Sequence, residues 1–261
     1  MVRPKKRLGQ HFLNDDNIAG KIAGTLDPSI HSVLEIGPGT GILTKHILQR
    51  PGFDLQVIEI DSESVEYLRT HYPALGDRII CGDFLTLEPS SLRSPDAALQ
   101  IIGNFPYNIS SQILFRVLEW KDRVKQVTGM FQKEVAERIA SPPGSKQYGI
   151  LSVLLQAFYD IDYLFTVNPS VFYPQPKVKS AVIRLRRNNV RALDCDEHLF
   201  FNVVKTSFNQ RRKTLRNSTR RLIAEHPATQ PAILDLRPEN LTVRQFTDLT
   251  LWIGAHSGKK S

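Results

Sequence analysis

The sequence has little cysteine and no long apolar run. Its two cysteines, Cys81 and Cys195, are too few for a disulfide framework, and neither has the neighbouring His or Cys residues that a metal site needs. No apolar segment approaches the roughly 18 residues of a membrane-spanning helix, and no signal-peptide core follows the basic first residues. We therefore expect a soluble, cytoplasmic protein that binds neither a metal nor a membrane.

Positive charge, in contrast, is abundant. The 261 residues include 34 Lys and Arg against 26 Asp and Glu, a formal net charge of +8. Such an excess favours polyanionic partners such as nucleic acid, although many basic proteins bind none. The length suits one α/β domain with a small second domain, and 41% hydrophobic residues allow a sizeable core.

Short apolar runs alternate with segments of helical spacing in the first half of the chain. The runs are residues 32–36, 55–60, 78–81 and 99–103. Strand and helix alternating at this pitch indicate βαβ units and a parallel sheet with helices on both faces. The expected fold class is therefore α/β.

The second half predicts the end of this sheet and then a different domain. Expected helices cover residues 110–120, 133–140 and 149–159, and expected strands cover 124–131, 161–167 and 180–185. The last two strands could form an antiparallel hairpin at the sheet's end. Beyond residue 188 the pattern is only helical, over 199–207, 213–224 and 243–253. We expect one domain over residues 1–187 and a small helical domain over 188–261.

A glycine-rich loop follows the first predicted strand. It reads Glu35-Ile36-Gly37-Pro38-Gly39-Thr40-Gly41. Glycines let the backbone pass close to a ligand, and the helix that follows offers free N-terminal amides. Because the third glycine comes one place earlier than in the dinucleotide fingerprint, a nicotinamide cofactor is disfavoured.

Polar side chains recur where the next three predicted strands end. They are Glu59 with Asp61, then Asp83, then Asn104. In an open α/β sheet the ligand binds outside the carboxyl ends of the strands, so these side chains should share one site. Glu59, about 20 positions after Gly37, suits a carboxylate that accepts ribose hydroxyls; otherwise it is a helix cap or a solvated acid. Asp83 could accept from an adenine amine or form an Asx turn.

The tetrad Asn104-Phe105-Pro106-Tyr107 predicts chemistry on an amine conjugated to a purine ring. Such an amine is a poor nucleophile, because its lone pair is delocalised. The Asn104 side-chain oxygen and a main-chain carbonyl near Pro106 could accept its N–H groups and localise that pair, with proline holding the backbone extended. Tyr107 offers a face for stacking a flipped base, although a core aromatic is the alternative.

These residues resemble the ribosomal RNA adenine N6-dimethyltransferases, specifically the bacterial small-subunit (16S) family. The matching motifs are KRLGQHFLN at residues 6–14, EIGPGTG at 35–41, EID at 59–61, GD at 82–83, GNFPYNIS at 103–110, QKEVAER at 132–138, YGILS at 148–152 and PKVKSAV at 176–182. The resemblance covers residues 3 to about 187 and continues weakly through 207–213. Phe105 stands where Leu is more usual, His11 replaces a frequent Asn, and Gln175 interrupts a proline run.

The resemblance implies a Rossmann-like methyltransferase sheet that uses S-adenosyl-L-methionine. The cofactor-binding positions that it implies are His11, Leu13, Gly37, Gly39, Glu59, Asp83 and Asn104. It further implies catalysis at Asn104, Pro106 and Tyr107, and a flipped adenine held between Tyr107 and Phe172, although composition alone makes Phe172 more typical of packing. Two adjacent adenines near the 3′ end of small-subunit RNA would each receive two methyl groups.

A basic run indicates where RNA would bind. Between Lys205 and Ala224 the basic residues are Lys205, Arg211, Arg212, Lys213, Arg216, Arg220 and Arg221. On a continuous helix Arg212, Arg216 and Arg220 would share one face at i, i+4 spacing; otherwise the run is a solvated surface. With a second cluster at residues 3–7, it predicts an RNA path between the domains.

Two other functions share much of this pattern. One is the sister methylase of large-subunit RNA, of the macrolide-resistance type, and the other is a non-catalytic RNA-binding assembly factor on the same fold. Intact Glu59, Asp83 and Asn104 argue against lost catalysis. We expect a monomeric enzyme that acts on the immature small ribosomal subunit.

Overall fold

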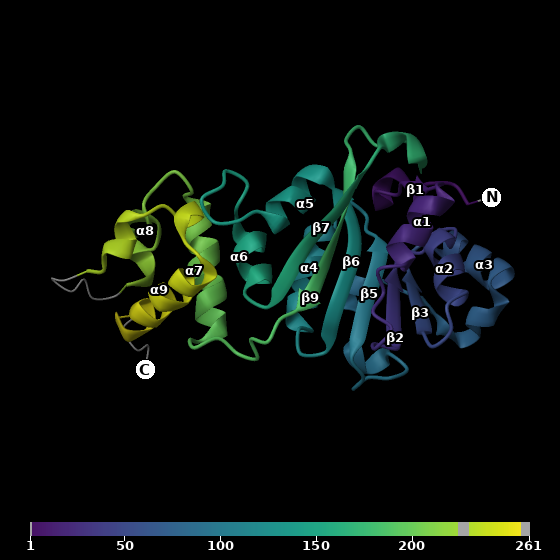
Figure 1. Ribbon diagram of the computed structural model, residues 1–261, viewed down its shortest axis with the longest axis horizontal. Helices are drawn as coiled ribbons and strands as arrows, with labels where there is room; N and C mark the ends of the chain where they lie inside the picture. Colours follow the sequence, from purple (N-terminus) through teal and green to yellow (C-terminus); the bar gives the residue numbers. More distant parts are fainter. Residues whose placement is uncertain (1, 224–229, 257–261) are drawn as a thin grey trace. The chain divides into compact units, whose positions relative to one another are not determined.

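The computed structural model describes residues 2–223 and 230–256, and within them seven strands form one sheet (Figure 1). The strands are β2 (Ser32–Ile36), β3 (Asp54–Glu59), β4 (Ile79–Cys81), β5 (Leu99–Asn104), β6 (Val124–Gln132), β7 (Tyr159–Val167) and β9 (Ser180–Arg187). Their order is β4-β3-β2-β5-β6-β9-β7. Strands β2 to β6 are parallel, and β9 is antiparallel to β6. The expected α/β class is confirmed, and β7 and β9 are neighbours as predicted.

Both faces of the central strands β2, β3, β5 and β6 are largely buried. On one face, Val33 and Val57 pack with side chains of three helices, α1 (Asp16–Ala23), α2 (Ile42–Leu48) and α3 (Ser62–His71), which Figure 1 shows together beside β2 and β3. Leu34 and Ile101 alternate with residues of that face and are 0% exposed. Because strand side chains alternate between faces, burial on both requires almost continuous apolar strands. This is why the apolar runs predicted the strands well.

The other helices are α4 (Ser110–Glu119), α5 (Lys133–Ala140), α6 (Ile150–Gln156), α7 (Glu197–Asn209), α8 (Leu215–Ser218) and α9 (Val243–His256). The chain divides into two compact units, residues 1–136 with 160–187 and residues 137–159 with 188–261. This differs from the expected division, which put 137–159 in the first domain. The reason is packing between distant segments: α6 contacts α7 and α9, and the Tyr148 and Phe208 rings meet edge to face.

The basic run does not form the predicted helical face. Arg212 lies in a turn, only Leu215–Ser218 is α-helical, and Arg220 begins a short 3-10 helix; Ala224 lies outside the described residues. The Thr219 hydroxyl donates to the Leu215 carbonyl at 2.7 Å, and such side-chain bonds compete with helix continuation. The i, i+4 alignment of Arg212, Arg216 and Arg220 was therefore wrong.

A short strand pair escaped prediction. Strand β1 (Phe12–Leu13) pairs antiparallel with β8 (Phe172–Tyr173). The Asn14 amide extends this pairing by donating to the Val171 carbonyl at 2.8 Å. The pair ties the N-terminal segment to the loop before β9, and this tie positions one wall of the site described below.

No helix of the described ranges is long and apolar enough to cross a membrane. The same ranges contain no group of three or more His, Cys, Asp or Glu side chains placed to hold a metal ion.

Candidate active site

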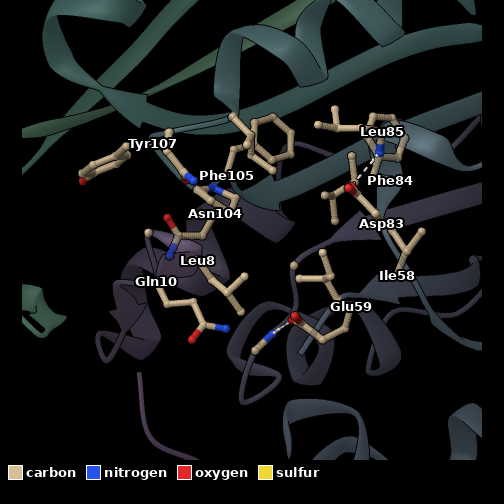
Figure 2. Close-up of a pocket in the computed structure, with 18 of the residues that line it drawn as sticks. Leu8, Gln10, Ile58, Glu59, Asp83, Phe84, Leu85, Asn104, Phe105 and Tyr107 are labelled. Carbon is tan, nitrogen blue, oxygen red and sulfur yellow. Dashed lines mark hydrogen bonds between the residues drawn. The ribbon is translucent and has the colours of Figure 1, made fainter. Parts of the chain in front are cut away.

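A pocket lies at the carboxyl ends of β2, β3, β4 and β5 (Figure 2). Glu59, Asp83 and Asn104 all line it, although they are far apart in the sequence. The strand order reverses between β2 and β5, and such a switch point opens a crevice for ligands. In the view of Figure 2, Tyr107 and Asp83 lie on opposite sides of Asn104. The structure thus brings the polar strand-end residues together in one pocket.

The glycine loop closes the end of β2 tightly. Gly39 has a left-handed φ of 57°, and a Cβ there would approach the Phe12 ring to 2.8 Å. A side chain at this position would thus be strained by its backbone and by contact with Phe12. Gly37 and Gly39 both line the pocket. Glycine is required here so that β1 can pack over the loop.

Glu59 holds the loop in place. Its carboxylate accepts the amide of Gly39 at 3.0 Å and that of Asp61 at 2.9 Å. Burial raises the pKa of Glu59, and these two hydrogen bonds oppose the shift. Glu59 is not the helix cap: Asp61 caps α3 by accepting the Glu63 amide. An ionised carboxylate has about four acceptor positions, so Glu59 retains capacity for a ligand's hydroxyl groups.

Glu35 lies beneath the same loop, fully buried. Its carboxyl accepts the Thr44 hydroxyl of α2 at 2.7 Å. Burial raises the pKa of Glu35 to about 8, with Glu59 adding to the rise and the Thr44 hydrogen bond opposing it. Near neutral pH the native state therefore keeps a proton on this carboxyl.

We predict that Glu35→Gln removes a loss of stability at alkaline pH. In the unfolded chain this carboxyl titrates near 4.5 and in the native state near 8, so the native state binds more protons between these values. The free energy of unfolding of the wild type should therefore fall as pH rises from 5 to 8. Glutamine keeps the acceptor for Thr44 and carries no charge. The melting temperature is measured at pH 5.5 and at pH 8.5. Between these values it should fall by roughly 5 °C more in the wild type than in Glu35→Gln.

The matched control for this exchange is Glu66→Gln, which alters an exposed glutamate of α3. It should leave the pH dependence of the melting temperature as in the wild type. Parallel profiles for wild type and Glu35→Gln would contradict the buried protonated carboxyl.

Asp83 combines a structural contact with exposure to the pocket. Its Oδ1 accepts the Leu85 amide at 2.9 Å, which caps the 3-10 helix Phe84–Thr86. This is the Asx-type geometry that was the alternative to ligand binding. The two roles coexist, since Asp83 also lines the pocket and its second oxygen remains available as an acceptor.

Asn104 ends β5, and its amide orientation is set by the N-terminal segment. Its Nδ2 donates to the main-chain carbonyl of His11 at 2.8 Å. With the nitrogen so engaged, the Oδ1 atom is left as the acceptor for a ligand. The Phe105 side chain next to it is 1% exposed, and Gly103 and Gly129 leave room for its ring.

Pro106 and Tyr107 continue the rim. The Pro106 carbonyl closes a turn by accepting the Ile109 amide at 3.2 Å. Tyr107 is half-buried, and its ring stacks on the His11 ring with centroids 5.3 Å apart. Burial raises the pKa of Tyr107, and the hydrogen bond between its hydroxyl and that of Ser180 opposes this rise. Tyr107 is therefore not merely a core aromatic, since it is only partly buried and lines the pocket.

The side chains of two predicted site residues, Leu13 and Phe172, lie in the core and not in the pocket. Leu13 is 2% exposed and Phe172 is 3% exposed, and both side chains belong to the apolar cluster that includes α1 and α2. The residues lining the pocket include neither of them. Packing, the alternative considered for Phe172, is what the structure shows. Any ligand contact by Leu13 would have to use its main chain.

Several pocket residues were missed by sequence reasoning. Among the apolar ones are Leu8, Ile60, Phe84 and Leu85, and Gln10 joins them from the N-terminal segment. Ile60 is 52% exposed, which apolar periodicity cannot reveal. The one sequence signal for Ile60 and Phe84 is that they directly follow the predicted site residues Glu59 and Asp83.

The N-terminal segment is clipped to the β3 end by charge. The Lys5 ammonium pairs with Asp61, and Gln10 Nε2 donates to the same carboxylate at 3.4 Å. Burial alone would raise the pKa of Asp61, but the Lys5 and Gln10 bonds lower it below its usual value. Leu8 to Phe12 thereby form a wall of the pocket.

A second pocket adjoins the first and shares Tyr107 and His11 with it. Its other residues include Gln132, Lys6 and Lys177. Both lysines are exposed, so this pocket is basic at its rim.

The fold and the strand-end pocket define a protein of the Rossmann-like α/β class. Comparisons with known proteins identify the family within that class. The family model described as ribosomal RNA adenine dimethylase matches residues 1–253. The chain therefore belongs to the ribosomal RNA adenine dimethylase family.

Related sequences and structures agree with this assignment. The ribosomal RNA small subunit methyltransferase A of Parabacteroides distasonis is 56% identical, covering 100% of this chain and 98% of its own length. That of Flavobacterium johnsoniae is 55% identical over 97% of both chains. A dimethyladenosine transferase from Plasmodium falciparum has a TM-score of 0.77 at 25% identity, covering 94% of this chain and 98% of that one. The 23S rRNA methyltransferase ErmE has a TM-score of 0.64 at 26% identity, covering 91% and 98%.

Proposed function

We propose that this protein transfers methyl groups from S-adenosyl-L-methionine to the N6 amines of two adjacent adenosines near the 3′ end of small-subunit ribosomal RNA. The observation that carries the proposal is the convergence of Glu59, Asp83 and Asn104 on one pocket. Relatives that are more than half identical and are named for the small subunit favour this substrate over large-subunit RNA. We further propose that the enzyme acts as a monomer on the immature subunit.

The pocket suits the adenosyl part of this cofactor. Glu59 has free acceptor positions for a ribose diol, and Asp83 has one for the amine of an adenine ring. Ile60 and Phe84 supply apolar walls for that ring. A Cβ at Gly82 would meet nothing within 4 Å, so there is open space beside Asp83. Gly37 and Gly39 are the proposed contacts of the methionine part. His11 and Leu13 are proposed to close over the cofactor, Leu13 through its main chain.

When bound, the cofactor supplies a methyl group on a positively charged sulfur. The protein's part is to orient the acceptor and exclude water. Asn104 Oδ1 would accept one N–H of the target amine, and a main-chain carbonyl near Pro106 would accept the other. These bonds localise the amine's lone pair toward the methyl group. No side chain needs to act as a strong base, because the methylated amine loses its proton readily to water.

The Tyr107 ring is the proposed stacking face for the flipped adenine. Base stacking on an aromatic ring contributes about 1–3 kcal/mol. Phe172 would complete a sandwich only after leaving the core, so we do not assign it that role in the present conformation. Lys6 and Lys177 at the second pocket are placed to attract the phosphates that flank the flipped nucleotide.

The rest of the RNA contact is proposed for exposed basic residues of each unit. In the first unit they are Arg3, Lys6 and Arg7, and in the second they are Arg212, Lys213, Arg220 and Arg221. Arg216 is less available, because it binds the Asp235 carboxylate at 2.7 Å. Phosphate contacts of this kind lose strength steeply as salt rises.

The proposed function predicts methylation of unmethylated small subunits in preference to large-subunit RNA. Purified protein is incubated with labelled S-adenosyl-L-methionine and either substrate, and the modified nucleotides are mapped. Label should appear as dimethyladenosine at two adjacent positions near the 3′ end of the small-subunit RNA. Label in large-subunit RNA instead would support the sister activity. Cofactor binding without methylation of any RNA would support the assembly factor.

A further inference from the structure

A hydrogen bond joins Tyr107 to the start of β9. The phenol oxygen of Tyr107 and the Ser180 Oγ are 2.5 Å apart. Ser180 is 0% exposed, and a buried hydroxyl without a partner is costly. Tyr107 supplies that partner, although it lies 73 positions away in the sequence. The motif around Ser180 has no role in the proposed function so far.

We infer that Ser180 is a positioning residue that holds the Tyr107 ring at the edge of the pocket for stacking against the target adenine. The inference rests on the proposed function, because it concerns the orientation of a base-stacking ring. Tyr107 has two side-chain torsions. An anchor at the phenol oxygen restricts the first, χ1, and so fixes where the ring lies, because rotation about χ2 leaves that oxygen in place. Its main chain is held as well, since Ser110 Oγ donates to the Tyr107 carbonyl at 3.2 Å.

The sheet makes Ser180 a rigid anchor. Ser180 is paired with Gln132 in the antiparallel β6–β9 register, and the Lys133 amide donates to the Lys179 carbonyl at 2.9 Å beside it. Partners in such a register project to the same side of the sheet, and Gln132 lines the second pocket together with Tyr107. The ring is therefore attached to the sheet at the edge of the pocket where the base is proposed to enter.

This attachment also defines what Tyr107 can contribute. Because its hydroxyl is engaged with a buried serine, the ring face is the part that remains for a substrate. His11 stacks on one face of the ring with the centroids 5.3 Å apart, so the base is proposed to stack on the opposite face. An unanchored ring would sample other orientations, and fewer flipped bases would reach the geometry for transfer.

The test is a double-mutant cycle with wild type, Ser180→Ala, Tyr107→Phe and the double variant. Methyl transfer to unmethylated small subunits is measured at saturating cofactor. Ser180→Ala should lower kcat by roughly three- to tenfold, in keeping with one lost hydrogen bond, with no change in cofactor affinity. In the Tyr107→Phe background, which already lacks the bond, Ser180→Ala should change kcat by less than about twofold.

Controls separate positioning from folding. Ser207→Ala removes another fully buried serine hydroxyl, which donates to the Val203 carbonyl in α7, and it should leave kcat unchanged. Ser180→Thr keeps the hydroxyl and should restore most of the activity lost in Ser180→Ala. If Ser180→Ala lowers kcat equally in the wild-type and the Tyr107→Phe backgrounds, the inference is overturned.

A further variant, Tyr107→Ala, distinguishes failure of the proposed function from failure of the positioning role of Ser180. If Tyr107→Ala retains full methyl transfer, the base-stacking role itself is wrong. If Tyr107→Ala is inactive while Ser180→Ala is fully active, the proposed function stands and the positioning role of Ser180 is overturned.

Discussion

Asn104→Ala is expected to lower methyl transfer by about 10²–10³-fold, the range seen when one oriented hydrogen-bonding group is removed from an active site. The amide nitrogen of Asn104 is held by the His11 carbonyl, which leaves its oxygen facing the pocket. Alanine removes that acceptor, so the target amine keeps a delocalised lone pair. The measurement is single-turnover transfer of labelled methyl to small-subunit RNA at saturating cofactor.

The fold should survive this change. Asn104 is half-buried at the end of β5, and the strand's ladder bonds do not use its side chain. The matched control is Asn17→Ala, which alters an exposed asparagine of α1 and should leave the rate unchanged. Retention of more than about a tenth of the wild-type rate in Asn104→Ala would count against a central role for this amide.

Glu59→Ala is expected to weaken cofactor binding by about 100-fold or more. Each hydrogen bond from a ribose hydroxyl to an ionised carboxylate is worth about 1.5–3 kcal/mol, and Glu59 is proposed to accept two. Its removal also leaves the amides of Gly39 and Asp61 without their acceptor, which should loosen the glycine loop and lower the melting temperature. Calorimetric titration with S-adenosyl-L-methionine, well below that temperature, checks the affinity.

Two further variants locate the effect. Glu59→Gln keeps an acceptor oxygen but lacks the charge, so its affinity should fall between the wild type and Glu59→Ala. Glu66→Ala, at an exposed site on α3, should bind as the wild type does. An unchanged dissociation constant in folded Glu59→Ala would contradict the proposal that the cofactor binds at this end of the pocket.

The strands and the polar residues at their ends were predictable because their signals are local. Residues 32–36 were predicted as a strand and form β2 with the same bounds. Burial on both faces makes such a strand largely apolar, with Glu35 as the buried exception. Parallel strands then bring their carboxyl ends to one edge, so the sequence alone was enough to group Glu59, Asp83 and Asn104.

The walls of the pocket were not predictable in the same way. Leu8 and Gln10 reach it because Lys5 pairs with Asp61 and β1 pairs with β8. Those contacts join distant parts of the chain and leave no periodic pattern. The second unit differs from the predicted helical domain for a related reason, because residues 137–159 join it through packing between segments that the sequence separates.

The two short strands β1 and β8 explain why His11 lines the pocket as predicted whereas the side chains of Leu13 and Phe172 do not. Neighbouring side chains in a strand face opposite ways. Phe12 therefore lines the pocket while Leu13 enters the core, and Phe172 is buried while Tyr173 is 62% exposed. A family resemblance marks the position along the chain, but it does not say to which side a side chain turns.

The pairing of β1 with β8 has a consequence for synthesis of the chain. Phe12 and Leu13 leave the ribosome early, yet their partners Tyr173 and Phe172 follow about 160 residues later. At roughly 5–20 residues per second, the wall over the glycine loop must wait about 8 to 30 seconds for its partner. A nascent chain that ends before Phe172 should therefore not retain the cofactor, even when its first strands have formed.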